Sequence, residues 1–362
     1  MIKIVHAADL HLDSAFAALS AEQAALLRRE QRRIVEDIAA QAERMSADIL
    51  LLSGDLFDSD RCFAETADAL CRAFEQTRAR VFISPGNHDW YGPRSPWMRM
   101  KLPDNVHVFT SPVPEKVELP ELGCTVWGAA FLSDSAEPPL AGFRADGEGV
   151  NIMVLHGDTD APDSKYGYIS EADIAASGLD YLALGHVHKY SGVRRAGDTF
   201  YAYPGCAMGR GFDELGEKGL LCGTVGKGSC ELRFLPLSGR KYEILPVDIT
   251  GAEDIAAAVR AAMPDGCGRD IYRVILRGER EEAPDTAALE VTLDGLCCRL
   301  EVRDETKPKL ELWAAEGENT LKGGFLRRMK AMYDAVESEA ERRKIIRAVS
   351  FGLAALENRE EG

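Results

Sequence analysis

Long apolar runs are missing from this sequence. None reaches the roughly 18 to 20 residues that a membrane-spanning helix needs. The first residues also lack the basic segment and long apolar stretch of a secretory signal. We therefore expect a soluble, cytoplasmic protein that does not contact a membrane.

Cysteine pairing motifs are absent too. The chain has 9 cysteines, an odd number, and no two of them have the C-x-x-C spacing of zinc or redox sites. This argues against a disulfide framework and indicates a reducing compartment. We expect the adjacent Cys297 and Cys298 to be ordinary small buried side chains.

Basic residues are fewer than acidic residues. There are 43 Lys and Arg against 59 Asp and Glu, which gives a formal net charge of −16. Because Lys and Arg supply most of the non-specific affinity for DNA, this charge argues against indiscriminate binding of polyanions. A nucleic-acid substrate would need a local basic surface or metal ions. Hydrophobic residues at 46% are close to globular usage, and 362 residues indicate about two domains.

Several short apolar runs end in polar or glycine-containing turns and have the length of buried strands. They lie at residues 2–5, 49–52, 81–83, 152–155 and 181–184. Helical spacing of apolar residues separates the first three runs, and this alternation predicts an α/β fold. Short β-rich runs at 106–130 and 192–236 predict a second sheet that packs on the first.

A change of pattern near residues 237–240 predicts a domain boundary. We predict one domain at residues 1–238 and a smaller α+β domain at 239–362, with an Ala-rich helix at 252–263. The tail, residues 319–357, reads as two helices joined near Ser338. Apolar residues of the first helix recur at spacings of three and four; they are Leu321, Phe325, Met329, Met332, Tyr333 and Val336.

Polar motifs stand at the carboxyl ends of the predicted strands. They lie at residues 9–11, 54–58, 86–89, 156–158 and 185–188, and they contain five of the seven histidines. In open α/β sheets the carboxyl ends of the strands converge on one crevice. Any one motif could be a helix cap or a core histidine, but five together indicate a single site.

The motifs supply seven metal-ligand side chains without a thiolate. These are Asp9, His11, Asp55, Asn87, His156, His186 and His188. Such oxygen and imidazole donors suit Mn²⁺, Fe or Zn²⁺. Seven are too many for one catalytic ion and suit two ions bridged by a carboxylate. We expect both members of the 9/11 pair and of the 186/188 pair to lie on one side of an extended segment.

In order and spacing, the five motifs resemble those of the calcineurin-like metallophosphoesterase superfamily. Within this superfamily, four stretches resemble DNA repair exonucleases of the SbcD/Mre11 type, and most nearly their YhaO branch. They are Asp-Leu-His-Leu-Asp-Ser at residues 9–14, Gly-Asp-Leu-Phe-Asp at 54–58, Leu-Gly-His-Val-His at 184–188 and Tyr-Pro-Gly-Cys-Ala-Met-Gly-Arg at 203–210. The resemblance covers residues 1 to about 240. It implies an αββα two-sheet sandwich with a smaller C-terminal α+β capping domain.

The resemblance also implies roles for individual residues. One ion would be held by Asp9, His11, Asp55 and His188, and the other by Asp55, Asn87, His156 and His186. Manganese is the expected metal. A hydroxide bridging the ions would attack the phosphodiester in line, while His88 stabilises the developing charge or protonates the leaving oxygen and Asp58 orients the His88 ring. A structural role for His88 and a capping role for Asp58 stay open.

Three residues are candidates for substrate contact. Arg94 lies in a Trp- and Pro-rich loop suited to base stacking and phosphate binding, Tyr166 follows the His156 motif, and Arg210 ends a glycine-rich turn. Simple loop packing stays open as the alternative for Arg94, and a tight connection between strands for the turn that ends at Arg210.

The implied function is a two-metal phosphodiesterase acting on DNA, an exonuclease with some endonuclease capacity, in DNA repair. By the same resemblance, C-terminal helices dock on an SMC-like or Rad50-like ATPase, and a predicted helix at residues 62–74 contacts a second copy in a homodimer. Two alternatives are a phosphodiesterase or nucleotidase with a small substrate, and a DNA-end-binding scaffold that barely hydrolyses anything.

Overall fold

The computed structural model describes residues 1–17, 19–146, 149–237, 239–280, 282–308, 312–336 and 338–356. The contacts within the chain define two compact units. The first is Met1–Glu243 with Arg269–Ile271, and the second is Ile244–Gly268 with Tyr272–Gly362. Ser238, at the predicted boundary, and Glu357, at the end of the predicted tail, lie outside the described residues. The division into domains at 238 and 239 stays a prediction.

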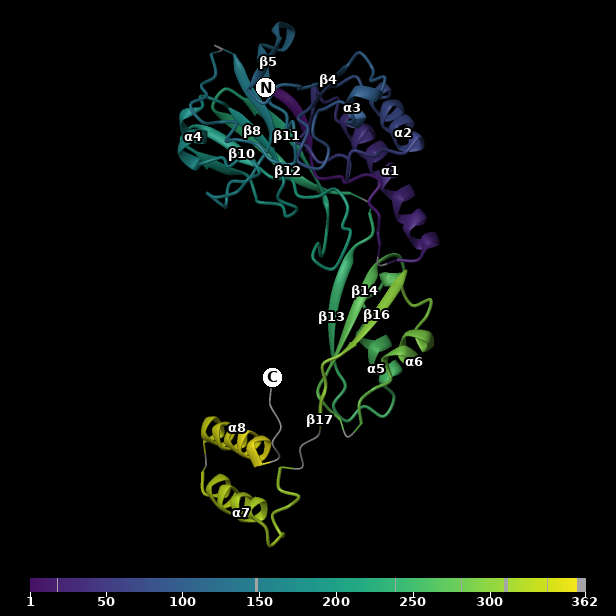
Figure 1. The fold of residues 1–362 in the computed structure, drawn as a ribbon, viewed down its shortest axis with the longest axis vertical. Coiled ribbons are helices and arrows are strands. Elements are labelled where there is room, and N and C mark those ends of the chain that lie inside the picture. The colour runs from purple at the N-terminus through teal and green to yellow at the C-terminus, as the bar shows by residue number, and fades with distance from the viewer. Residues whose placement is uncertain are drawn as a thin grey trace. The chain divides into compact units, whose positions relative to one another are not determined.

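Two six-stranded sheets form the first unit (Figure 1). The first sheet has the order β12-β11-β1-β2-β3-β4, with strands Ser229–Pro236, Gly219–Gly226, Ile2–Ala7, Ile49–Leu52, Arg80–Ile83 and Val106–Val108. The second has the order β5-β6-β7-β8-β10-β9, with strands Glu115–Leu119, Cys124–Gly128, Val150–His156, Tyr181–Gly185, Thr199–Ala202 and Arg194–Ala196. The two predicted sheets are confirmed.

The assignment of strands to sheets differs from the prediction in one respect. The β-rich runs do not form the second sheet by themselves, because β4, β11 and β12 join the first sheet while β7 and β8 belong to the second. The reason is pairing over long sequence distances: β11 lies antiparallel to β1, with Ile4 opposite Gly223. The apolar pattern of one strand carries no information about such a partner.

Helices cover the outer faces of both sheets. α1 (Ala21–Arg44) and α2 (Ala64–Glu75) pack on the first sheet, and the short α4 (Glu171–Ala176) packs on the second (Figure 1). α1 begins with a capping box in which Ser20 and Gln23 satisfy each other's backbone N–H groups. α2 begins after Phe63, so Cys62 precedes the helix predicted at 62–74. Short turns of helix occur at α3 (Pro96–Arg99) and η1 (Pro120–Leu122).

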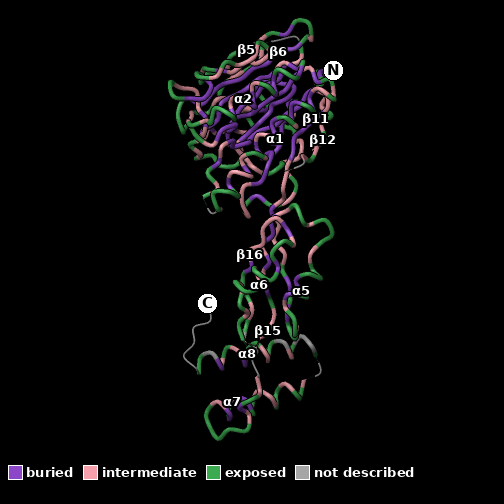
Figure 2. The backbone as a smooth tube through the Cα atoms, turned by 90° about the vertical axis from the view of Figure 1, so that its right-hand side faces the viewer, coloured by how far each residue is buried: buried purple, intermediate pink, exposed green. Residues whose placement is uncertain are grey.

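Alternation along the strands produces three apolar layers. In β1, Val5 faces the helices while Ile4 faces the second sheet, where it joins a core with Phe82 and Tyr181. A third cluster lies on the outer face of the second sheet. Figure 2 shows that the central part of this unit is buried, whereas edge strands such as β5 have exposed residues. The predicted α/β sandwich is therefore confirmed.

The second unit contains two helices and most of a small sheet, whose strands β13 and β14 begin in residues assigned to the first unit. Its strands have the order β13-β14-β16, Tyr242–Asp248, Ile271–Arg277 and Arg299–Asp304. α5 (Ile255–Ala262) and α6 (Thr286–Thr292) pack on it around Val259, Val274 and Leu276. The remaining short elements are η2 (Cys267–Arg269), β15 (Glu279–Arg280) and β17 (Lys307–Pro308).

Two further helices, α7 (Leu321–Asp334) and α8 (Glu339–Leu356), pack on each other. Their buried contacts come from Leu326, Val349 and Leu353. The predicted apolar face of the first helix is only partly right, because Leu321 and Met332 are exposed. Leu326 was omitted from that face although it is the most buried side chain of the helix.

All nine cysteines are free thiols. Cys297 is buried, as expected, whereas Cys298 is only partly buried. Among the helices in the described ranges, none combines the length and the apolar character that a bilayer crossing requires.

Candidate metal centre

The first two motifs lie side by side beyond the ends of β1 and β2. The backbone N–H of Asp9 donates to the carbonyl of Gly54 at 3.1 Å, and that of His11 donates to the carbonyl of Asp55 at 2.9 Å. These bonds continue the β1–β2 pairing into the two loops. They bring Asp9, His11 and Asp55 to the same edge of the first sheet.

The backbone of these motifs is strained and not extended. Asp9, His11 and Asp55 have φ angles of 51°, 44° and 52°, and His186 has 112°. Non-glycine residues rarely adopt this region, and such strain concentrates at functional sites. The expectation that each Asp-x-His or His-x-His pair shares one side of an extended segment is therefore wrong. Tight left-handed turns bring the side chains together instead.

The structure brings all seven predicted donor side chains together. Donor atoms of Asp9, His11 and His188 lie within 4.8 Å of one another, as do those of Asp9, Asp55 and His156. Asn87 Oδ1 lies 3.0 Å from His156 Nε2, and the His186 ring centroid lies 5.3 Å from that of His156. Asp9 is common to both groups, so the two sets of donors are contiguous.

The hydrogen-bond pattern of His11 and His188 fits a cation between them. The Nδ1 of His11 donates to Asp58 Oδ1 at 3.2 Å, and the Nδ1 of His188 donates to Glu214 Oε1 at 2.6 Å, because a carboxylate only accepts. The two Nε2 atoms, 3.1 Å apart, then present lone pairs to each other. Only a proton or a metal ion makes that contact favourable, so the donor set fits a metal.

In the second group, too, a histidine directs its free lone pair at other electron donors. His156 Nδ1 donates to the main-chain carbonyl of Ser53 at 2.9 Å, which leaves its Nε2 lone pair directed at two oxygen acceptors. These are Asn87 Oδ1 at 3.0 Å and Asp55 Oδ2 at 3.4 Å. Burial lowers the pKa of the nearby His186 to about 4, so that imidazole is a neutral donor of electrons at neutral pH.

Asp89 holds the two loops that carry Asp55 and Asn87. Its buried carboxylate accepts backbone N–H groups of Asp55, Leu56, Phe57 and Gly86 at 2.8 to 3.3 Å. Its hydrogen bonds therefore fix the backbone of both loops. Gly86 has to be glycine, because a Cβ there would collide with the Asp55 carboxylate.

An ionic network supports the other side of the cluster. Arg210 donates to Asp58 Oδ1 at 2.9 Å and to Glu214 Oε1 at 3.0 Å, and each of these carboxylates also accepts from a histidine of the cluster. Although burial acts to raise it, the bonds from His188 and Arg210 hold the pKa of Glu214 well below its usual range. One guanidinium thus links the partners of His11 and His188.

His88 lies beside the cluster with one ring nitrogen anchored. Its Nδ1 donates to the main-chain carbonyl of Asp58 at 3.1 Å, and its ring centroid lies 4.8 Å from that of His11. Asp58 therefore contacts His88 through its backbone, while its carboxylate is engaged by His11 and Arg210. The Nε2 of His88 is left as the atom that can act on a substrate.

The three candidate substrate residues have different positions. The Tyr166 ring lies against His186, with centroids 4.9 Å apart. Arg210 is at the cluster, but Asp58 and Glu214 occupy its terminal nitrogens. Arg94 is 80% exposed and its nearest ionic partner is Asp60 at 3.8 Å, so no contact joins it to the cluster.

One residue of the site escaped the sequence reasoning. Glu214 was not singled out at all, and nothing in its short glycine-flanked loop signals a role. Asp13, just after the first motif, caps α2, since it accepts the N–H of Phe63 at 2.8 Å and the hydroxyl of Thr66 at 2.6 Å.

Comparisons with known proteins agree with this geometry. The profile of the calcineurin-like phosphoesterase family matches residues 2–190, just over half of the chain. The chain therefore belongs to the calcineurin-like phosphoesterase family. Members of this family are metal-dependent phosphoesterases, which is consistent with the observed donor cluster.

Individual relatives are similar to this chain at low to moderate sequence identity. The uncharacterized metallophosphoesterase YhaO of Bacillus subtilis is 31% identical over 269 residues, 71% of this chain. The match spans 65% of that relative, just under two thirds of its length. The DNA double-strand break repair protein Mre11 of Methanopyrus kandleri is 23% identical over 89% of this chain and 75% of its own. A dimetal phosphatase structure from Danio rerio has a TM-score of 0.41 at 10% identity, covering 66% of this chain and 99% of that chain.

Proposed function

We propose that this protein is a two-metal phosphodiesterase that cleaves DNA in repair, as an exonuclease with some endonuclease capacity. The observation that carries the proposal is the pair of contiguous donor groups that share Asp9, with Asp55 Oδ2 within 3.8 Å of His11 Nε2 and 3.4 Å of His156 Nε2. The ions would be held by Asp9, His11, Asp55 and His188 on one side and by Asp55, Asn87, His156 and His186 on the other. The oxygen and imidazole donors suit Mn²⁺, with Fe and Zn²⁺ as alternatives.

The chain's own residues would prepare a phosphodiester for in-line displacement. Divalent cations at this centre, when bound, polarise phosphoryl oxygens and stabilise the charge that develops on them. His88 would deliver a proton from Nε2 to the leaving oxygen, since the bond from its Nδ1 to the Asp58 carbonyl fixes the ring and its tautomer. Asp58, Arg210 and Glu214 would hold His11 and His188 in register.

DNA as the substrate has support from sequence similarity. The relative from Methanopyrus kandleri, which aligns over 89% of this chain, is named as a double-strand break repair protein. The net charge of −16 then predicts weak, salt-sensitive DNA binding by the isolated chain. A Rad50-like ATPase partner or a homodimer would supply the missing positive surface, and the α7–α8 pair and α2 are the proposed contacts for these partners.

Digestion with Mn²⁺ tests the proposal. Linear duplex DNA and single-stranded DNA are incubated with the protein beside cyclic nucleotides and nucleoside monophosphates, and the variant Asp55→Ala serves as the inactive control. We expect both DNA substrates to be shortened and the control to leave them intact. Turnover of the small substrates alone would contradict DNA as the substrate and favour the small-substrate phosphodiesterase. DNA-end binding without hydrolysis of any substrate would favour the scaffold alternative.

A further inference from the structure

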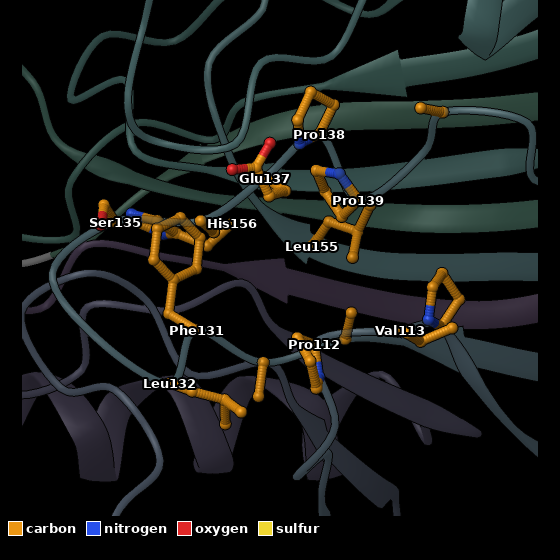
Figure 3. A pocket seen from close by; sticks show the side chains of 15 residues that line it. Pro112, Val113, Phe131, Leu132, Ser135, Glu137, Pro138, Pro139, Leu155 and His156 are labelled. Carbon is orange, nitrogen blue, oxygen red and sulfur yellow. The ribbon is translucent and has the colours of Figure 1, made fainter.

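A cavity of about 440 Å³ opens beside the metal centre. Three segments form it: residues 112–114, residues 129–141 and the end of β7 (Figure 3). We call it the side cavity. His156 lines it and also belongs to the donor cluster, so the cavity and the candidate metal centre share a wall. Its volume lies within the range of about 300 to 1,000 Å³ that is usual for small-molecule sites.

Main-chain bonds tie the first wall of the side cavity to the Asn87 loop. The N–H of Phe131 donates to the carbonyl of Pro85 at 3.1 Å, and the N–H of Tyr91 donates to the carbonyl of Phe131 at 2.8 Å. The Phe131 ring meets the His156 ring edge to face, with centroids 5.5 Å apart. This wall is therefore fixed relative to two of the predicted metal ligands.

The opposite wall is tied to His186. Ala136 pairs with the segment around Tyr166 through bonds from its N–H to the Lys165 carbonyl at 3.0 Å and from the Gly167 N–H to its carbonyl at 3.1 Å. The Tyr166 ring in turn lies on His186. The first wall is thus tied to the loop that carries Asn87, and the second wall to a ring that lies on His186, so both walls adjoin residues of the donor cluster.

The lining of the side cavity suits a flat, apolar group with a polar edge. Four prolines line it, and their rings are rigid and contribute no N–H groups; they are Pro112, Pro114, Pro138 and Pro139. In Figure 3, Pro138 and Pro139 lie on one side and Pro112 on the other, with Phe131 and His156 toward one end. Glu137 and Ser135 supply the polar atoms of the lining.

We propose that the side cavity binds the base of the nucleotide whose phosphate lies at the metal centre. A heterocyclic base would place its faces against the prolines and Phe131, and its N–H edge toward Glu137 and Ser135. An acyl chain would make no hydrogen bond to these two exposed polar side chains. The inference rests on the proposed phosphodiesterase function and adds that the substrate is recognised through its base.

Inhibition constants of matched compounds test the proposal. Hydrolysis of bis(p-nitrophenyl) phosphate by the Mn²⁺-loaded protein is inhibited by the 3′- and 5′-monophosphates of thymidine and by the corresponding base-free deoxyribose phosphates. These pairs share the phosphate and the sugar and differ only in the base. We expect at least one thymidine monophosphate to bind roughly tenfold more tightly than its base-free partner, the size of one base-stacking contact. Calorimetry gives the same comparison without turnover.

The double variant Val113→Ser and Leu132→Ser removes two exposed apolar side chains of the side cavity. We expect it to reduce the tenfold preference to about twofold or less. Val291→Ser is the matched control, because Val291 is an exposed valine on α6 in the second unit. It should keep the full preference.

The results separate the two proposals. No hydrolysis of bis(p-nitrophenyl) phosphate would count against the phosphodiesterase itself. Hydrolysis with equal affinity for both members of each pair would overturn the base site alone. A preference that survives in the double variant would show that the base binds elsewhere.

Discussion

The interior of the sandwich and its rim hold buried histidines in different ways. His6 lies inside β1 with no exposed surface, and both of its ring nitrogens have a neutral partner: Tyr181 Oη at 2.8 Å and Ser53 Oγ at 2.9 Å. At the rim, the Nδ1 atoms of His11 and His188 bond to carboxylates, and their Nε2 atoms face each other. Burial does not distinguish His6 from His11, which is 1% exposed.

The difference separates a structural imidazole from a proposed ligand imidazole. A structural imidazole has a complementary partner for both nitrogens, because an unpaired buried polar atom is costly. The proposed ligand imidazoles have one nitrogen paired and the other directed at a second electron donor. Four experiments can break or sharpen this comparison.

Removal of Asp55 should have the largest effect. Its carboxylate lies 3.4 Å from His156 Nε2 and 3.8 Å from His11 Nε2, so both donor groups depend on it. We expect Asp55→Ala to lose more than about a hundredfold in turnover, beyond the loss typical of outer partners, together with bound metal. Metal content by mass spectrometry and phosphodiester hydrolysis measure the two losses. Full metal content in this variant would contradict the assignment.

His88→Ala should separate catalysis from metal binding. Because His88 is proposed to transfer a proton and not to hold an ion, turnover should fall by about 10² to 10⁴ while metal content is unchanged. His107→Ala is the matched control, since this histidine lies in β4 away from the cluster, and it should keep its activity. Loss of metal from His88→Ala would instead make this residue a ligand.

Glu214→Ala tests the ionic support of His188. We expect metal affinity to fall by about 10- to 100-fold, because the Nδ1 of His188 loses its acceptor and Arg210 loses one of its two partners. Calorimetric titration with Mn²⁺ should show one weakened site and one normal site. The exposed Glu118→Ala in β5 is the control. Equal weakening of both sites would contradict the separate support of the two groups.

His6 should give the smallest effect, visible only in stability. Burial lowers the pKa of His6 to about 3, so the folded protein excludes a proton that the unfolded chain binds below about pH 6.5. The His6 contribution therefore lowers the free energy of unfolding by about 1.4 kcal/mol for each pH unit between these values as pH falls. Urea unfolding in the presence of EDTA, at pH values from 7 to 5, measures this pH dependence of the free energy of unfolding. The same slope in His6→Gln would show that another group is responsible.

The sequence allowed the donors to be found because each follows a strand end. Asp9, Asp55 and His156 stand where a buried apolar run stops, and parallel strands bring such positions to one edge. Their exact presentation could not be predicted, since left-handed φ angles at Asp9 and Asp55 come from pairing between loops 45 residues apart. Local patterns describe strands, not contacts between loops.

Support from distant loops was equally invisible. Glu214 reaches His188 across 26 residues, and no motif or periodicity marks it. The position of Arg210 was anticipated, but its engagement with Asp58 and Glu214 depends on three separate segments. The sheet membership of β11 and β12 depends likewise on pairing with a strand more than 200 residues away.

The pairing of β1 with β11 affects how the chain folds during its synthesis on the ribosome. β1 lies between β2 and β11 in the first sheet, and β11 and β12 are made only at residues 219–236. Until then β1 is an open edge with apolar side chains on both faces, which is a template for aggregation. The nascent chain must therefore keep this edge protected for more than 200 residues of synthesis. A fragment that stops at residue 190 should be insoluble even though it carries every predicted metal ligand.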